Sequence, residues 1–195
     1  MDTFGTFHLA DNPALYEPAR TNNFEFVVTD IDGIQRAGIK DGALVTDNDY
    51  INNAQEVLRV SVLSSTVPHF TSSVIDVKRG NSTMHFAGTP TFNDHTLVLN
   101  DYMGARTKSA LLAWQALCYD VRTDRVPVAT VYKKNCWLYE YSPDYKTIIR
   151  KWRMIGCWIT GLDEPEFSNE TNDKKTVTAK IIYDRAIPML PDENE

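Results

Sequence analysis

At 195 residues the chain is long enough to bury a substantial core, and its length favours one domain with appendages. The content of 43% hydrophobic and 24% charged residues is typical of a globular protein and excludes a disordered one. A formal net charge of −6 argues against a protein that grips the phosphates of nucleic acid, because that function requires a basic surface.

The N-terminal segment, residues 1–19, combines two prolines with scattered apolar side chains and predicts an arm rather than a regular element. Docking on a neighbouring subunit and folding back on its own domain explain this composition equally well. The first residues lack a basic start and a long apolar run, so we expect no signal peptide. No window of the sequence is apolar enough to predict a membrane span.

The first half of the chain predicts strands interrupted by one long loop. Apolar side chains alternate in Asn23–Thr29, as in a half-buried strand. Residues 34–55 show no such alternation and predict a long polar loop, of the kind that is usually functional or disordered. Glu56–Thr66 is rich in valine and predicts a strand that Pro68 ends. Residues 74–78 and 82–87 flank Arg79-Gly-Asn81 and predict a hairpin.

A single long helix is predicted at about residues 101–119, directly after a strand at Thr91–Leu99. Asn100 or Asp101 can cap it by accepting a hydrogen bond from the first turn. Leu111, Trp114 and Leu117 recur at helical spacing and form its core-facing stripe.

The second half predicts three further strands. They cover Asn135–Tyr141, with Trp137, Tyr139 and Tyr141 on one face; Thr147–Gly161, with Trp152, Met154 and Trp158 sharing a face; and Thr176–Arg185. The chain is therefore predicted to be mainly β with α+β character, an antiparallel sandwich or barrel of about eight strands with one flanking helix and extended loops. Its domain is expected to span residues 20–188, and an acidic tail follows at 189–195.

The sequence offers no convincing active site, so we predict no enzyme, no cofactor and no catalytic or metal-binding residues. The four histidines are far apart, none of the three cysteines lies in a CxxC motif, and phosphate- and nucleotide-binding motifs are missing. The cysteines are expected to be reduced and mostly buried, as in a cytosolic protein. The tryptophans and tyrosines of 137–158 allow a stacking platform for a sugar or base, although packing or interface roles are more common for such residues.

Several segments in order resemble the tail tube proteins of contractile-tailed bacteriophages, which share their fold with the ring-forming type VI secretion tube protein. The likeness covers about residues 20–188. It is carried by the segments Arg20-Thr-Asn-Asn-Phe-Glu-Phe26, Val62-Leu-Ser-Ser-Thr-Val-Pro68, Arg79-Gly-Asn81, Gly88-Thr-Pro-Thr-Phe92, Leu97-Val-Leu-Asn-Asp101, Leu111-Leu-Ala-Trp114, Trp152-Arg-Met-Ile-Gly-Cys-Trp-Ile-Thr-Gly161 and Ile182-Tyr-Asp-Arg185.

The resemblance implies a structural virion protein whose subunits form six-membered rings that stack into a tube inside a contractile sheath. The implied partners are other copies of the chain, the sheath protein, the baseplate or tube initiator, and, transiently in the lumen, the tape measure protein and DNA. The implied location is the virion tail, with assembly in the host cytoplasm. A net acidic protein also suits a lumen that repels phosphate and lets DNA slide.

Contacts between subunits are expected in the polar loop 34–55, and we predict that Gly38–Asn53 reaches the next ring. The candidate contact residues are Gly38, Lys40, Asp41, Asp47, Asn48, Asp49, Tyr50, Asn52 and Asn53. Three alternatives stay open: a tube initiator or other baseplate protein of the same fold, a type VI secretion-like ring protein, and a carbohydrate-binding β-sandwich module.

Overall fold

The computed structural model describes residues 18–31, 36–40, 43–47, 53–102, 107–119, 121, 123–168 and 173–191, with main chain alone for 36–40 and 43–47. The elements of this part of the chain are β1 (Phe24–Val28), β2 (Arg36–Lys40), β3 (Ala43–Asp47), α1 (Ala54–Ser61), β4 (Val62–Ser65), β5 (Phe70–Arg79), β6 (Ser82–Phe92), β7 (His95–Asn100), α2 (Thr107–Ala116), α3 (Ala129–Tyr132), β8 (Lys134–Tyr141), β9 (Ile148–Asp163), β10 (Thr176–Ile182) and β11 (Arg185–Met189). The mainly β, α+β class predicted from the sequence is confirmed.

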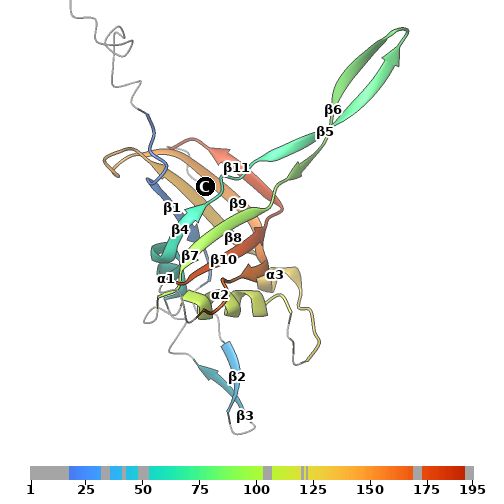
Figure 1. Cartoon of the computed structure of the whole chain (residues 1–195). Coiled ribbons are helices and arrows are strands. Elements are labelled where there is room, and N and C mark those ends of the chain that lie inside the picture. The colour runs from blue at the N-terminus through green and yellow to red at the C-terminus, as the bar shows by residue number, and fades with distance from the viewer. Residues whose placement is uncertain are drawn as a thin grey trace, which may run out of the picture.

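One antiparallel sheet forms the body of the molecule (Figure 1). Its strand order is β1-β8-β9-β10-β7-β4, and β11 also pairs with β9. The strand β9 is 16 residues long. It pairs with β8 from Ile148 to Cys157 along one edge, and with β11 and then β10 along the other edge. The outer strands of this order are β1 and β4, which approach each other because the sheet curls.

The core lies on the concave face of this sheet. Alternate residues of each strand point inward, which is the two-residue period of a half-buried strand. The helices α1 and α2 lie together at the lower end of the body in Figure 1 and add their apolar faces to the same cluster. The buried residues include Phe26, Leu97, Leu99, Leu138, Met154, Ile159, Val177, Ile181, Leu58, Leu111 and Trp114.

The helix α2 presents the residues that the sequence predicted to face the core. Leu111 and Trp114 are fully buried, and Leu117, one residue beyond the helix, packs against the same cluster. The Trp114 indole N–H donates a hydrogen bond to the Tyr132 carbonyl at 3.3 Å. The Asp101 carboxylate accepts a 3.4 Å hydrogen bond from the Lys108 N–H, so it satisfies a first-turn donor although the helix begins later than predicted.

The predicted strand at Glu56–Thr66 was wrong over its first half, which forms α1. Ala54, Leu58 and Ser61 are buried and follow the spacing of one helix face, whereas Val60 is exposed. The Ser61 hydroxyl hydrogen-bonds the Thr107 hydroxyl at 2.8 Å and joins α1 to the start of α2. Tertiary packing against β1 and α2 therefore overrides the strand preference of the valines.

Two further predictions need correction. The segment 34–55 contains a hairpin, β2–β3, in which Arg36 pairs with Asp47, so it is not a loop without regular structure. Met154 and Trp158 do not share a face, because Met154 is fully buried in the core whereas Trp158 points to the other side of the sheet and contacts Tyr132. The change of face is caused by an irregularity at Gly156, between these two residues.

Gly156 bends β9 where its partner changes from β11 to β10. Its φ of 73° is a left-handed conformation that glycine adopts without strain. A Cβ at this position would also meet the Asp184 carboxylate, which accepts hydrogen bonds from the Lys133 ammonium at 2.7 and 2.8 Å. Backbone conformation and space therefore both require glycine here.

We expect Gly156→Ala to lower the free energy of unfolding by about 1–3 kcal/mol, because it combines left-handed backbone strain with a clash. Gly161→Ala is the matched control on the same strand, since nothing lies within 4 Å of a Cβ built there. Urea unfolding followed by tryptophan fluorescence measures both. Equal stability of the two variants would contradict this account of the bend.

His95 is buried where three strands of the curled sheet meet. Its ring stacks on Phe26 of β1 with the ring centroids 5.1 Å apart. Its ring nitrogens lie 3.2 Å from the Ser65 hydroxyl of β4 and 3.3 Å from the hydroxyl of Thr66. Burial lowers the pKa of His95 to about 4, because the charged imidazolium is poorly solvated there.

Acidification should therefore destabilise the fold. The unfolded chain binds the His95 proton below about pH 6.5, whereas the folded chain binds it only below about pH 4. The contribution of neutral His95 is thus complete above pH 6.5 and is lost as the pH falls to 4, a total of about 3 kcal/mol. Urea unfolding at pH 7.0, 5.5 and 4.5 tests this, with His95→Phe expected to show a smaller decrease than the unaltered protein. An equal decrease in both proteins would contradict it.

Candidate assembly interface

The hairpin β5–β6 projects away from the body of the molecule (Figure 1). Its register pairs Ile75 with Phe86 and Val77 with Met84, which places these four side chains on one face. They are between 40% and 53% exposed. A two-stranded hairpin with an uncovered apolar face is marginally stable in water, so this face is a candidate for contact with another protein surface.

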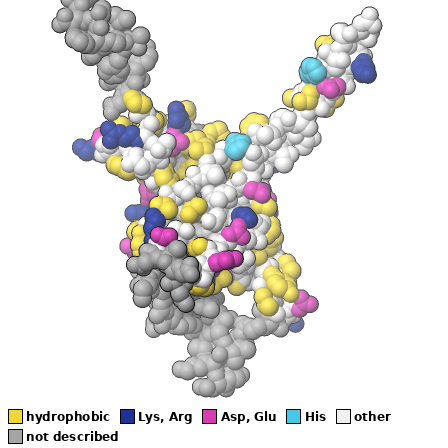
Figure 2. Space-filling model, in the orientation of Figure 1, with side chains coloured by type: hydrophobic (Ala, Val, Ile, Leu, Met, Phe, Trp, Pro, Cys, Tyr) yellow, Lys and Arg dark blue, Asp and Glu magenta, His cyan; other side chains and the backbone are white. Residues whose placement is uncertain are grey.

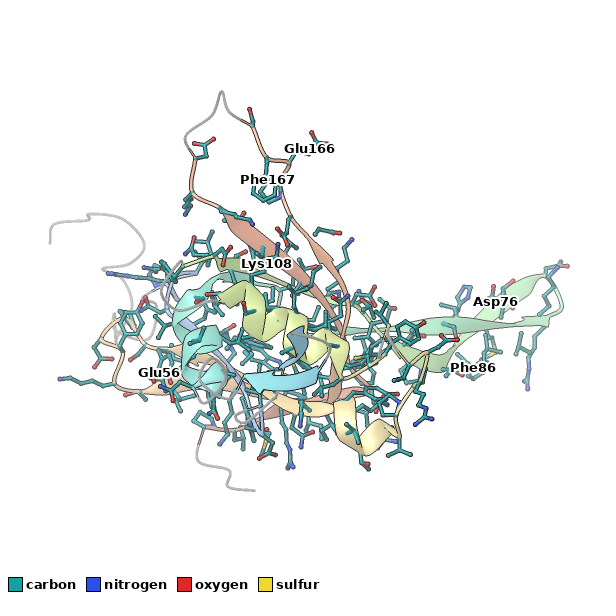
Figure 3. The ribbon with its side chains drawn as sticks, turned by 90° about the horizontal axis from the view of Figure 1, so that it is seen from below. Glu56, Asp76, Phe86, Lys108, Glu166 and Phe167 are labelled. Atoms are coloured by element: carbon teal, nitrogen blue, oxygen red, sulfur yellow. The ribbon has the colours of Figure 1, made fainter. Side chains whose placement is uncertain are left out.

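The opposite face of the same hairpin is polar toward its tip, where it carries Asp76 (Figure 3) and the paired Lys78 and Thr83. The Asp76 carboxylate lies 2.6 Å from a ring nitrogen of His85. Nearer the body this face carries the exposed Val74. The contact between Asp76 and His85 is exposed and adds little to stability. The outer part of the hairpin is therefore amphipathic, and its apolar face is the one that requires cover.

The base of the hairpin is fixed to the body by aromatic packing. The Phe92 ring lies 5.9 Å from Phe70 across the hairpin and 5.8 Å from Tyr183 of the core, centroid to centroid. The Tyr183 hydroxyl donates a 3.4 Å hydrogen bond to the His69 carbonyl, and the Asn93 N–H donates one of 3.1 Å to the same atom. These contacts set the direction in which the hairpin leaves the body.

A groove of about 670 Å³ separates the two outer strands of the curled sheet, β1 and β4. We call it the seam groove. Its lining is apolar along the floor and charged at the rim, where the Arg59 guanidinium lies 2.8 Å from the Glu25 carboxylate. The lining residues are Arg20–Phe26, Arg59, Val62–Ser65, Val67, Leu138 and Glu140.

Glu25 also accepts a 2.6 Å hydrogen bond from the Tyr141 hydroxyl, so one carboxylate joins α1, β1 and β8 beside the seam groove. Burial, together with this hydrogen bond to an anion, raises the pKa of Tyr141. Tyr141 therefore stays a hydrogen-bond donor at any physiological pH, and the rim keeps its arrangement.

A second charged cluster holds the start of the β9–β10 connection against α2. The Glu164 carboxylate lies 2.8 Å from the Lys108 ammonium and 3.1 Å from that of Lys175. The hydrogen bond from Lys108, with support from Lys175, lowers the pKa of Glu164. Lys175 also lies 4.7 Å from the ring centroid of the exposed Phe167. Figure 3 labels Lys108 and Phe167, which lie in the upper part of that view.

The aromatic residues of β8 stack on one another along the outer face of the sheet. Trp137 and Tyr139 are nearly parallel, with 5.9 Å between centroids, and Tyr139 lies 6.4 Å from Tyr141. The Arg153 guanidinium covers the other side of Trp137 at 5.7 Å, and only 9% of Trp137 is exposed. The rings thus occupy each other's faces, which leaves little ring surface for a glycan or a base.

The raised pKa values of two cysteine thiols disfavour the reactive thiolate, so these side chains are better suited to packing than to nucleophilic chemistry. Burial and the neighbouring Cys157 raise the pKa of Cys136 well above its usual value, and burial raises that of Cys118. Among the described residues, no three histidine, cysteine or acidic side chains lie close enough together to hold a metal ion. No helix in the described part of the chain is long and apolar enough to cross a membrane.

The residues predicted to mediate ring contacts fall on and around the β2–β3 hairpin. Gly38 and Lys40 lie on β2, Asp47 ends β3, and Asn53 directly precedes α1 and accepts a 2.9 Å hydrogen bond from the Val57 N–H. The other predicted residues, Asp41, Asn48, Asp49, Tyr50 and Asn52, lie outside the described residues. In Figure 1 β2–β3 lies below the helices, at the end of the molecule opposite to β5–β6.

Sequence reasoning found the β5–β6 hairpin but missed its apolar face. The signal is present in both strands, because the polar residues Asp76 and His85 each separate two apolar residues. Only the register shows that the apolar residues of the two strands share a face. Figure 2 shows hydrophobic side chains on this hairpin beside a histidine (cyan) and an acidic side chain (magenta).

No protein-family model matches the sequence, and no curated protein matches it. Solved structures are similar over nearly the whole chain. A chain of the tube-terminating cap of the anti-feeding prophage is 13% identical with a TM-score of 0.60, covering 89% of this chain and 92% of that one. A chain of the sheath–tube complex of the extracellular contractile injection system PVC is 14% identical with a TM-score of 0.59, covering 96% and 99%.

A chain of the six-fold symmetrised baseplate of the anti-feeding prophage is 9% identical with a TM-score of 0.59, covering 91% of this chain and 99% of that one. At sequence identities this low, the structural similarity establishes the fold and nothing finer. The protein therefore has the tail-tube-like fold that is found in these contractile injection assemblies, as the resemblance in its sequence predicted.

Proposed function

We propose that this protein is a structural subunit that assembles with copies of itself into rings, which stack into the tube of a contractile tail or injection apparatus. The fold supports this role, because the similar chains come from a tube-terminating cap, a sheath–tube complex and a baseplate. The role is that of a building block, and no catalytic step belongs to it.

The observation that carries the proposal is the amphipathic β5–β6 hairpin. It places Ile75, Val77, Met84 and Phe86 far from the core of their own subunit, with nothing in the described chain covering them. A second copy of the same chain can cover this face, so no other protein is needed for the contact. Because each copy both offers a hairpin and receives one, the contact is heterologous, and such contacts close into rings or extend into filaments.

The same comparison supports the proposed partners and geometry. Six copies per ring is supported by the six-fold symmetrised baseplate, and a surrounding sheath by the sheath–tube complex. We further propose that the tube belongs to a phage tail and conducts DNA, with a tape measure protein in the lumen before ejection. The net charge of −6 supports this, because an acidic lumen repels phosphate and DNA passes without binding.

A tube-terminating or baseplate-proximal ring is the second candidate. It is supported by the fact that the cap and baseplate chains match as well as the sheath–tube chain does. Copy number separates the two functions, since a tube subunit is repeated in every ring of the particle and a terminator occupies one. Quantitative mass spectrometry of purified particles measures this ratio against the sheath protein.

Removing the apolar face of β5–β6 should prevent assembly without unfolding the subunit. We expect Ile75→Ser/Phe86→Ser to raise the protein concentration needed for tubes roughly a hundredfold, since burying two such side chains contributes about 3 kcal/mol. The matched control is Lys78→Ser/His85→Ser on the polar face of the same strands. Negative-stain microscopy over a concentration series gives the readout. Tubes formed equally by both double variants would contradict the proposed contact.

The β2–β3 hairpin is proposed to reach the next ring of the stack. Arg36 and Asp47 are paired, so a short Gly–Ser linker can join them in place of residues 37–46. We expect this variant to fold and to form single rings that no longer stack. Circular dichroism checks the fold, and analytical ultracentrifugation separates rings from tubes. Stacked tubes of normal length would contradict this role for the hairpin.

A further inference from the structure

At the seam groove, the main-chain groups of the outer strands have no neighbouring strand to pair with among the described residues. Tyr141 donates its N–H to the Asn23 carbonyl at 2.8 Å, and the Thr29 N–H bonds Asn135 at 2.8 Å, so the odd-numbered residues of β1 pair with β8. Strand geometry then directs the main-chain groups of Phe24 and Phe26 at the groove. In the described part of the chain, no main-chain hydrogen bond to these two residues comes from the groove side.

The opposite wall has the same property. The Thr66 N–H bonds the Thr96 carbonyl at 3.1 Å and continues the pairing of β4 with β7, so the main-chain groups of Ser65 point at the groove. Leu63 and Val67 are 43% and 48% exposed, although they stand beside the core. The groove therefore offers strand edges on both walls and apolar side chains between them.

The groove is narrow. The Cα atoms of β1 and β4 come within 8 Å of each other where the two strands are nearest. Neighbouring strands lie about 4.8 Å apart, so one inserted strand needs roughly 10 Å between the walls and a two-stranded hairpin about 14 Å. A single extended chain suits this groove better than the β5–β6 hairpin does.

We propose that the groove receives an extended stretch of residues 1–17 from a second copy of this chain; the inference rests on the proposed self-assembly. This segment joins the body at residue 18, next to Arg20–Asn22, which line the groove. It contains apolar Phe4, Phe7 and Leu9 for the floor. It also carries three acidic residues and no lysine or arginine. Of the charged lining residues, Arg59 pairs with Glu25 and Glu140 pairs with Arg150, so the acidic segment complements Arg20.

The length of the segment allows exchange between copies. Pro18 restricts residue 17 to extended backbone, and Pro13 restricts residue 12 in the same way. An extended segment of 17 residues spans about 55 Å, which is enough to reach a neighbour.

A mixed disulfide experiment tests the exchange. Full-length Phe7→Cys with one affinity tag is mixed with full-length Leu63→Cys carrying another, assembled, and oxidised with oxidised glutathione. We expect a cross-linked pair that bears both tags, with Val126→Cys as the exposed control in place of Leu63→Cys. Cross-linking only within single chains of a Phe7→Cys/Leu63→Cys double variant would overturn the proposal, and so would the absence of any cross-link.

A truncation lacking residues 2–17 and the groove variant Leu63→Asp separate this inference from the proposed function. Both should fold, judged by urea unfolding, and both should need at least tenfold more protein than the full chain to form tubes. If the full chain and both variants assemble equally, the exchange of N-terminal segments is refuted and self-assembly stands. If the full chain forms no higher assembly at any concentration, the proposed function fails together with this inference.

Discussion

The main-chain ladder of β9 is the interaction on which the rest of the structure depends. This strand pairs with β8, β10 and β11, so its 16 residues connect almost every part of the curled sheet. The bend at Gly156 lies between the part of β9 that pairs with β11 and the part that pairs with β10.

Because the sheet curls but does not close, its outer strands keep unpaired main-chain groups within the described chain. A fully closed sheet has no free edges, whereas this one keeps unpaired main-chain groups on β1 and β4 beside a groove. Free edges are a hazard in a protein that must stay monomeric and an asset in one that joins its own copies. The same reasoning applies to the apolar face of β5–β6, which a solitary soluble subunit has no reason to retain.

Local signals predicted the parts of the fold in which sequence and packing agree. The β8 strand and the core face of β10 follow from alternation alone, and the stripe through Leu111 and Trp114 follows from helical spacing. The helix α1 could not be found this way, because valines that favour strands are held in a helix by contacts with β1 and α2. Trp158 was assigned to the wrong face because one left-handed glycine reverses the alternation.

The candidate interfaces were harder to foresee than the core, for a physical reason. A seam between β1 and β4 joins residues about 40 positions apart, and no local period encodes which strands become the outer ones. The apolar face of the hairpin needs the register of two strands before its four side chains can be grouped. The similarity to tube proteins, by contrast, lies in the order of whole segments along the chain, so sequence alone revealed it.

The hairpin described above also bears on the timing of assembly. A contact surface carried on a two-stranded arm is flexible and weak when it meets one partner, because ordering the arm consumes much of what burial contributes. In the proposed ring, each added subunit contacts two neighbours, so the loss of one contact does not release it. Growth of such a ring has a slow nucleation step and a threshold concentration, so under this proposal free subunits accumulate until a template starts the polymer.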